Sequence, residues 1–210
     1  MALPRFAPNS ANGIHQVVMR QNLRRAIFLD RDGVINRSRV IDGKAYAPRR
    51  LEDFRLLPGV RNAMLDLTTA GFVLVVVTNQ PDIGNALVEA SVVEAMNDRL
   101  RRETPVMDIY CCPHSQKVKC DCRKPAPGML LMAAHEHGIA LSASYMVGDR
   151  PSDVECGRRA GCKTVFIDRG YREILGESAD LVASSLPQAT RLILSDSMIE
   201  LNAGAGLQSF

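Results

Sequence analysis

Residues 26–36 have the sequence AIFLDRDGVIN, in which four apolar residues run directly into two carboxylates and a glycine. A short apolar run bounded by polar and turn residues is typical of a buried strand in a parallel sheet. If the chain stays extended beyond that strand, Asp30 and Asp32 project to the same side, because side chains alternate along a strand. Two carboxylates in one small volume repel each other unless they share a cation or one holds a proton. The stretch therefore predicts either a functional site or a turn with solvated carboxylates.

Strands and helices alternate along the rest of the chain. Further strands are expected at residues 72–77, 106–111, 144–147 and 164–167, with a short edge strand at 179–183. Helices are expected at residues 57–69, 88–102, 128–137, 151–160 and 186–194. Residues 37–54 are polar and contain turn residues, which predicts a long loop. This order predicts an α/β fold with a doubly wound parallel sheet in one domain, residues 24–196, between an N-terminal arm (1–23) and a C-terminal tail (197–210).

Composition limits the classes of protein to which the chain can belong. Its 210 residues, 46% apolar and 23% charged, are typical of one soluble globular domain. The net charge of +3 is too small to indicate a nucleic-acid or membrane-surface partner, and no stretch reaches the ~20 apolar residues of a membrane span. The N-terminus lacks the apolar core of a secretory signal, so we expect a cytoplasmic protein without disulfides. We also expect a monomer, although no pattern in the sequence bears on the oligomeric state. The six cysteines are then metal ligands, nucleophiles or core residues.

Polar side chains follow four of the expected strands at their carboxyl ends. They are Asp30 and Asp32, Thr78 and Asn79, Lys124 after a cysteine-rich loop, and Asp149. Carboxyl ends of parallel strands share one sheet edge, where α/β folds bind ligands. Carboxylates suit Mg²⁺, a hydroxyl, amide and ammonium suit phosphoryl oxygens, and a carboxylate can also be a nucleophile that forms an aspartyl-phosphate. The group indicates phosphoryl transfer, and the chain has no Walker-type loop.

Each motif taken alone has a simpler explanation. Residues 30–33 could be a turn, and Thr78 or Asp149 could cap the helix that follows it. Asp153 lies one helical turn beyond Asp149 and could support a metal from outside its ligand shell or be another first-turn acid. Together, in this order and at strand ends, the motifs favour a site over these alternatives.

Four candidate metal ligands lie within eleven residues after the third expected strand: Cys112, His114, Cys120 and Cys122. Three thiolates and an imidazole match the tetrahedral shell of Zn²⁺, and a shell without an open position is typical of structural zinc. The alternative is a loop of free thiols with a surface histidine. Cys111 is expected to be a buried core residue, and Cys156 and Cys162 are expected in the core or near the surface.

The motifs at residues 30–36, 78–80, 123–125 and 148–153 resemble the four ordered motifs of the haloacid-dehalogenase-like phosphatases. This resemblance covers roughly residues 25–194 and implies a Mg²⁺-dependent phosphomonoesterase. It implies that Asp30 is the nucleophile, and that Asp32 protonates the leaving alcohol and later activates water. It also implies that Thr78 and Lys124 bind the phosphoryl oxygens. Asn79, beside Thr78, and Arg123, beside Lys124, are further candidates to bind the substrate. Mg²⁺ would be held by Asp30, Asp149 and the backbone carbonyl of Asp32.

The zinc motif is similar to that of a zinc-bearing branch of this family, which includes phosphatases of a heptose bisphosphate and of histidinol phosphate. Members lack a large cap domain, and no insertion here is large enough to form one. The resemblance implies a small phosphorylated metabolite as substrate, most closely a sugar bisphosphate. Histidinol phosphate and a non-enzymatic, zinc-stabilised binding module with a decayed site are the alternatives. Arg123, Lys44, Arg49 and Arg50 are candidates to bind a second phosphate.

Two departures from the family's pattern fall where specificity is set. Residues 81–86, PDIGNA, stand where the family usually has Ser-Gly-Ile-Ala-Arg-Gly, so an arginine is missing and Asp82 has appeared. The zinc ligands also lie closer together in sequence than in many relatives, which implies a smaller wall. Both departures bear on the substrate and not on the reaction; an acid such as Asp82 would favour a substrate with an amino group.

Overall fold

The computed structural model describes residues 23–173 and 178–206, so residues 1–22 of the predicted arm lie outside the described part. Six parallel strands form one sheet in the order β5-β4-β1-β6-β7-β8. Their bounds are β1 Ala26–Leu29, β4 Val73–Asn79, β5 Asp108–Cys112, β6 Tyr145–Gly148, β7 Lys163–Ile167 and β8 Leu181–Ala183. The sheet confirms the predicted α/β class.

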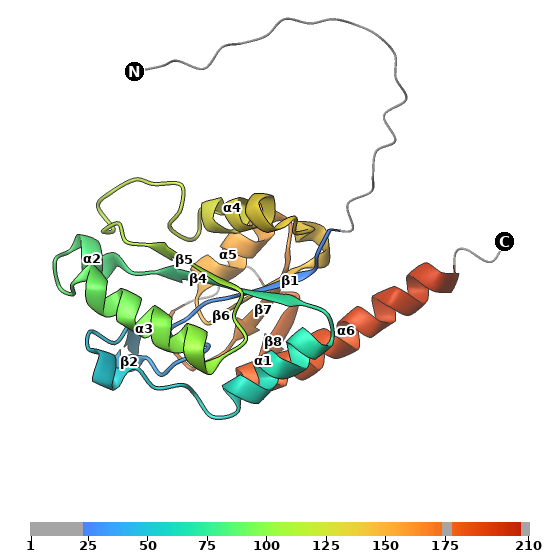
Figure 1. Cartoon of the computed structure of the whole chain (residues 1–210), viewed down its shortest axis with the longest axis horizontal. Coiled ribbons are helices and arrows are strands. Elements are labelled where there is room, and N and C mark those ends of the chain that lie inside the picture. Colours follow the sequence, from blue (N-terminus) through green and yellow to red (C-terminus); the bar gives the residue numbers. More distant parts are fainter. Residues whose placement is uncertain (1–22, 174–177, 207–210) are drawn as a thin grey trace, which may run out of the picture.

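Helices cover both faces of this sheet (Figure 1). One face carries α1 (Val60–Thr69), α3 (Ala90–Glu103) and α6 (Leu186–Gly206), and the other carries α4 (Gly128–His137) and α5 (Pro151–Ala160). Within β1, Ile27 and Leu29 pack in the first core, whereas Ala26 and Phe28 pack in the second. The apolar run is unbroken because a strand between two helix layers is buried on both sides.

The register of the sheet brings several strand ends to one place. β1 lies between β4 and β6, and Leu29 is level with Val76 and Val147. The residues that follow these three strands therefore emerge side by side at the carboxyl edge. The strand order also reverses here, because β4 and β5 lie on one side of β1 and β6 to β8 lie on the other. Such a switch point is where open α/β sheets bind their ligands.

The prediction of a plain loop at residues 37–54 is wrong, because this stretch contains a β-hairpin. β2 (Arg39–Ile41) and β3 (Lys44–Tyr46) pair antiparallel, and a 3-10 turn, η1 (Leu51–Asp53), follows. Asp42 and Gly43 connect the strands with φ of 51° and 76°, as a two-residue hairpin turn with positive φ at both positions requires. The strand residues are mostly exposed and lack an alternating apolar pattern, so no periodicity in the sequence indicates a strand here.

Two helices also differ from the prediction. A short helix, α2 (Pro81–Gly84), follows β4 where the sequence indicated no helix. α6 continues to Gly206, so it extends past residue 194 into the stretch predicted as a tail. In Figure 1, α6 starts beside α1 and its C-terminal part projects away from the sheet. This stretch contains leucine and alanine, which favour helix, and no proline to stop it.

Burial and helix hydropathy bear on the expectations drawn from composition. Cys156 and Cys162 are buried in the core as expected, whereas Cys111 is only half-buried and its predicted core position is wrong. Within residues 23–173 and 178–206, none of the helices combines the length and the apolar character that a bilayer span needs. The expected location and oligomeric state stay predictions.

Candidate active site

Three buried carboxylates meet at the carboxyl edge of the sheet. Asp30 follows β1, Asp149 follows β6, and Asp153 lies in the first turn of α5. They are 6%, 2% and 1% exposed, and one oxygen from each lies within 4.8 Å of the other two. The structure thus brings Asp30 and Asp149 together, as the sequence predicted, and adds Asp153 to the same cluster.

The ammonium of Lys124 lies between two of these carboxylates. Its Nζ is 2.7 Å from Asp30 Oδ1 and 2.7 Å from Asp153 Oδ1, and it donates to the carbonyl of Val77 at 2.8 Å. Burial opposes the charge of Lys124, but the two carboxylates outweigh it and raise the pKa of this lysine above its ordinary value. Lys124 therefore supplies a permanent positive charge in a buried place.

The charges of this cluster do not balance. Three carboxylates face one ammonium, and both oxygens of Asp149 are buried without a hydrogen-bond partner. Burial, followed by the charges of Asp30 and Asp153, raises the pKa of Asp149 well above the ordinary aspartate value. Burial likewise raises the pKa of Asp30 to about 6, although Lys124 acts in the opposite direction. A divalent cation would remove this penalty, and carboxylate oxygens are ligands that suit Mg²⁺.

Gly33 lets the backbone approach this cluster closely. Its φ is 94°, a conformation that glycine adopts without strain. A Cβ atom at this position would lie 1.8 Å from Asp149 Oδ2, so a larger residue would displace that carboxylate. The glycine of residues 26–36 is thus required where the chain passes the acid best suited to bind a cation.

Asp32 lines the same pocket but is held by other residues. Its Oδ1 accepts a hydrogen bond from Asn36 Nδ2 at 2.8 Å, and its Oδ2 accepts one from Gln80 Nε2 at 2.7 Å. Arg31 Nη2 forms an ion pair with Oδ2 at 3.1 Å. The Asp32 side chain is 12% exposed and borders the cavity. Its position is therefore set separately from that of the three buried carboxylates.

The two polar residues at the end of β4 have different surroundings. Thr78 is buried, and its Oγ1 accepts a hydrogen bond from Gln80 Nε2 at 2.9 Å. Asn79 exchanges two hydrogen bonds with the backbone of Lys124, each at 3.1 Å. Asn79 also lines the cavity, so it both borders the pocket and holds the loop that carries Lys124.

A cavity of about 370 Å³ opens above these residues. Asp30, Asp32 and Lys124 line its floor, and its walls come from β3, α2, the loop after β5 and the start of α5. Arg150 lines it as well, but its guanidinium donates to Glu173 and to a hairpin carbonyl, each at 2.5 Å. The hairpin that the sequence did not reveal is therefore a wall of the pocket.

Lys44 of the hairpin also lines this cavity, and its surroundings differ from those of the other cations. Its ammonium lies 5.8 Å from the centre of the Tyr46 ring, and it has no hydrogen bond or carboxylate partner among the described residues. Arg49 and Arg50, the other candidates for a second phosphate, are paired with carboxylates. Arg49 Nε lies 2.7 Å from Asp82 Oδ2, and Arg50 pairs with acids of η1.

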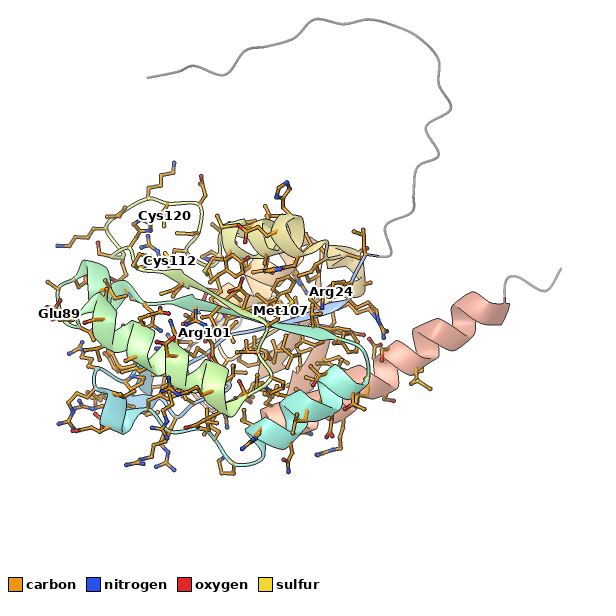
Figure 2. The ribbon with its side chains drawn as sticks, viewed as in Figure 1. Arg24, Glu89, Arg101, Met107, Cys112 and Cys120 are labelled. Atoms are coloured by element: carbon orange, nitrogen blue, oxygen red, sulfur yellow. The ribbon has the colours of Figure 1, made fainter. Side chains whose placement is uncertain are left out.

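The four predicted zinc ligands converge, and we call residues 112–122 the zinc loop. Cys112 Sγ lies 3.7 Å from Cys120 Sγ and 3.5 Å from His114 Nδ1, and Cys122 Sγ lies 3.3 Å from the same nitrogen. A tetrahedral ion with Zn–S bonds of about 2.3 Å needs S–S separations of about 3.8 Å and S–N separations of about 3.5 Å. Figure 2 shows Cys112 at the end of β5 and Cys120 in the loop beyond it. The cluster has the donors and the spacing of a zinc site.

Arg123 holds the zinc loop from one side. Its guanidinium donates to the carbonyl of Ser115 and, at 2.6 Å, to that of Val118. Gly84 of α2 approaches the same loop so closely that a Cβ atom would lie 2.4 Å from Ser115 N. Arg123 borders the cavity, but these contacts are with the loop, so its contact with substrate stays a prediction.

Sequence reasoning missed the residues that hold Asp32. Arg31 reaches Asn97 of α3, which lies 66 positions away, and Gln80 connects Asp32 with Thr78 across 48 positions of sequence. No local pattern reveals such contacts. One signal was available, because an arginine that stands between two acids just beyond a buried strand is seldom buried unless it is paired.

Three comparisons with known proteins agree with this geometry. A family model described as HAD-hydrolase-like matches residues 121–189. The chain is 38% identical over 184 residues to a D-glycero-beta-D-manno-heptose-1,7-bisphosphate 7-phosphatase of Escherichia coli K12, covering 79% of this chain and 93% of that protein. A protein of the same name from Photorhabdus laumondii is 35% identical over 183 residues, covering 80% and 94%.

Two solved structures have a similar fold. The D,D-heptose 1,7-bisphosphate phosphatase of B. bronchiseptica, complexed with magnesium and phosphate, has a TM-score of 0.72 and 27% identity, covering 82% of this chain and 99% of that one. A HAD-like phosphatase structure from Mesorhizobium loti follows with a TM-score of 0.65 and 28% identity, covering 83% and 88%. The chain therefore belongs to the haloacid-dehalogenase-like phosphatases, which are phosphoric monoester hydrolases.

Proposed function

We propose that this phosphatase removes the 7-phosphate of D-glycero-D-manno-heptose 1,7-bisphosphate. The reaction is supported chiefly by one observation, the buried cluster that Asp30, Asp149 and Asp153 form around Lys124. This cluster has excess negative charge and borders an open cavity. The choice of substrate is supported by the names of the curated relatives, which match most of the chain. A cavity with several cationic side chains is also consistent with a sugar that carries two phosphates.

Mg²⁺ is the cofactor that fits these carboxylates. Asp30, Asp149 and the backbone carbonyl of Asp32 would hold it, and the unpartnered oxygens of Asp149 support that set. When bound, the ion neutralises charge on the phosphoryl oxygens. Asp153 is committed to Lys124 Nζ and to the backbone N–H of Arg150, so its role is to hold the ammonium beside the nucleophile.

In the first step, Asp30 attacks the phosphorus atom. Lys124 holds Asp30 Oδ1, so the other carboxylate oxygen forms the new O–P bond while the P–O bond to the sugar breaks. Asp32 gives its proton to the departing oxygen. Thr78 and Lys124 bind phosphoryl oxygens. The products are an aspartyl-phosphate at Asp30, a neutral alcohol and the carboxylate of Asp32.

In the second step, a water molecule attacks the phosphorus atom of the aspartyl-phosphate. Asp32, now a carboxylate, takes a proton from this water as the new O–P bond forms. The bond between Asp30 and phosphorus breaks, which releases inorganic phosphate and restores the Asp30 carboxylate. Asp32 ends the cycle protonated, as it began.

Zn²⁺ is proposed as a structural ion in the zinc loop. All four ligands are protein side chains, so no position is left for water or substrate. The loop leads directly into Arg123 and Lys124, and the backbone N–H of Gln80 donates to the carbonyl of Cys112 at 2.8 Å. An ion in this loop would therefore hold both the lysine and the end of β4 in place.

A phosphate-release assay tests the proposal. With Mg²⁺, the wild type should release one phosphate per heptose 1,7-bisphosphate and leave the sugar 1-phosphate, identified by ³¹P NMR. Asp32→Asn should accumulate the phosphorylated enzyme from an activated aryl phosphate, because water is no longer activated. Failure to hydrolyse the bisphosphate, with activity on other phosphomonoesters, would overturn the substrate but not the reaction.

The alternative of histidinol phosphate lacks support in the pocket. Asp82 is the acid that could have met an amino group, but Arg49 lies 2.7 Å from it and neutralises it. The alternative of a binding module without activity is set aside, because the chain is a phosphatase of this family.

A further inference from the structure

Arg31 is a buried arginine with one carboxylate partner. Its side chain is 0% exposed, and Nη2 lies 3.1 Å from Asp32 Oδ2 and 3.3 Å from Oδ1. Nη1 donates to Asn97 Oδ1 at 2.9 Å, and the guanidinium lies 5.7 Å from the centre of the Phe54 ring. Among the described residues, no second carboxylate forms an ion pair with it.

Stability of the core gives little reason for this arginine. Taking a charge out of water costs several kcal/mol, and replacing a buried ion pair with apolar groups is often neutral or stabilising. Arg31 Nε is buried without a hydrogen-bond partner, so its burial is not fully compensated. The contacts that Arg31 does make run from α3, through Asn97, to Asp32. Its placement is therefore best explained by what it does to Asp32.

The carboxyl group of Asp32 is held from three sides. Asn36 donates to Oδ1, Gln80 donates to Oδ2, and Arg31 Nη2 lies against both oxygens. A carboxylate has about four acceptor sites, so three donors leave about one for the cavity that Asp32 lines. The carboxyl group cannot rotate without breaking at least two of these hydrogen bonds.

We propose that Arg31 is a positioning residue, fixed by Asn97 and Phe54, that holds the Asp32 carboxyl group with its open site toward the leaving oxygen of the substrate. The inference rests on the proposed role of Asp32 as acid and base. Its effect is on geometry, because misplacing a reacting group by about 1 Å can cost ~10²-fold in rate. Gln80 shares the task from the opposite side and connects it to Thr78.

Leaving-group dependence is a sensitive test of this inference. A sugar alkoxide is a poor leaving group and needs the proton from Asp32, whereas 4-nitrophenolate leaves without one. The value of kcat/KM covers the steps up to departure of the leaving group, so it does not include hydrolysis of the aspartyl-phosphate. The ratio of kcat/KM for a sugar phosphate to kcat/KM for 4-nitrophenyl phosphate therefore reports how well Asp32 is placed. Misfolded enzyme lowers both values equally and leaves the ratio unchanged.

Arg31→Met is expected to lower this ratio by ~10²-fold, in line with the usual worth of a general acid. Asn97→Leu should lower it less, about 10-fold, because it removes only the far anchor of Arg31. Arg31→Lys should recover part of the ratio, since it keeps a charge but not the two-sided contact. Arg99→Met is the matched control: Arg99 also lies over Phe54, at 6.0 Å, but does not touch Asp32, so the ratio should not change.

Two results separate this inference from the proposed function. If Arg31→Met and Asn97→Leu lower both activities equally, Arg31 is only structural and the inference is overturned. Asp32→Asn provides the reference, because it must itself lower the ratio if Asp32 is the acid. An unchanged ratio in Asp32→Asn would instead contradict the proposed mechanism.

Discussion

The floor and the wall of the pocket are built in opposite ways. By the floor we mean here the buried charged cluster beneath the cavity, Asp30, Lys124, Asp149 and Asp153, which is almost free of solvent. Its three acids follow a strand or start a helix at the switch point of the sheet, and Lys124 comes from the segment that follows the zinc loop. The wall, comprising the β2–β3 hairpin, α2 and the zinc loop, is largely exposed and is built from two short strands, one short helix and a loop. One of its acids, Asp82 of α2, is paired with Arg49, which follows the hairpin.

This difference indicates that the floor determines the chemical step and the wall determines the choice of substrate. In the floor, burial strengthens every electrostatic interaction and fixes each group, as phosphoryl transfer requires. In the wall, charges are screened by water, so their contribution is selective binding rather than rate. Substitutions in the floor should therefore change kcat by large factors, whereas those in the wall should act mainly on KM and on the choice of substrate.

The largest expected effect is that of Asp30→Asn. Loss of the proposed nucleophile should lower kcat by about 10⁴-fold or more, because residues that act as a unit in covalent catalysis cause losses of this size. The measurement is release of phosphate with Mg²⁺ under saturating substrate. Asp66→Asn, at an exposed position of α1, is the control and should keep wild-type activity. Activity of Asp30→Asn near the wild-type level would contradict the assignment of the nucleophile.

Removal of a proposed zinc ligand from the wall should lower activity through its effect on the floor. Cys120→Ser should abolish stoichiometric zinc and lower kcat/KM by about 10²-fold, because the zinc loop leads directly into Lys124. Metal analysis measures the zinc, and cleavage by trypsin at Lys117 or Lys119 measures opening of the loop. Cys111→Ser is the control, since this neighbouring cysteine is outside the ligand cluster. A zinc-free variant with full activity would show that the wall does not position the lysine.

Much of the floor could be predicted from sequence, because its determinants are local. β1, α4 and α5 have the bounds that apolar runs, prolines and glycines indicated, and the acids after the strands converge through parallel topology alone. Asp153 stayed ambiguous, because whether it faces the sheet or solvent depends on the start of α5. Arg31 was missed because its partner Asn97 comes from a helix 66 positions away.

The wall could be predicted less well, for physical reasons. Of the strand residues of its hairpin, only Ala45 is buried, so these residues carry no alternating apolar pattern. Its acid Asp82 pairs with Arg49, 33 positions away, and whether Arg49 meets a substrate or Asp82 is decided by the tertiary structure. The proposed zinc ligands are the exception, because four donor residues at short spacing are themselves the signal that predicted their convergence.

Removal of one charge from the floor should stabilise the metal-free protein. Asp149→Asn replaces a buried, unpartnered carboxylate with a neutral amide, which should raise the free energy of unfolding in EDTA by about 1–3 kcal/mol. For a chain of this size, that corresponds to a rise in Tm of several degrees, measured by thermal unfolding. Mg²⁺ should raise the Tm of the wild type but not that of the variant, which should be inactive.

The pH dependence of this effect follows from the raised pKa of Asp149 and from its cause, burial. A carboxyl group whose pKa is higher in the folded than in the unfolded state contributes most to stability at acid pH, and that contribution is lost as pH rises through the folded value. In EDTA, the stability advantage of Asp149→Asn should therefore grow with pH. An advantage that is constant or shrinks as pH rises would show that the floor does not carry excess charge.

The smallest expected effect comes from the wall, at Lys44. Among the cations that line the cavity, Arg123 is held by the zinc loop, Arg150 by Glu173 and Lys124 by the floor, whereas Lys44 has no such partner among the described residues. We therefore expect Lys44→Gln to raise KM about 10-fold for a sugar bisphosphate, a loss of about 1.4 kcal/mol, with little change in kcat.

The matching sugar monophosphate decides whether that effect is specific. Without a second phosphate there is nothing for Lys44 to bind, so Lys44→Gln should leave its KM within about two-fold of the wild type. Lys44→Arg should keep most of the preference for the bisphosphate, and Lys117→Gln, an exposed lysine of the zinc loop that does not line the cavity, should change neither KM. A large loss of kcat in Lys44→Gln would contradict the division between floor and wall, because a residue of the wall would then take part in the chemical step.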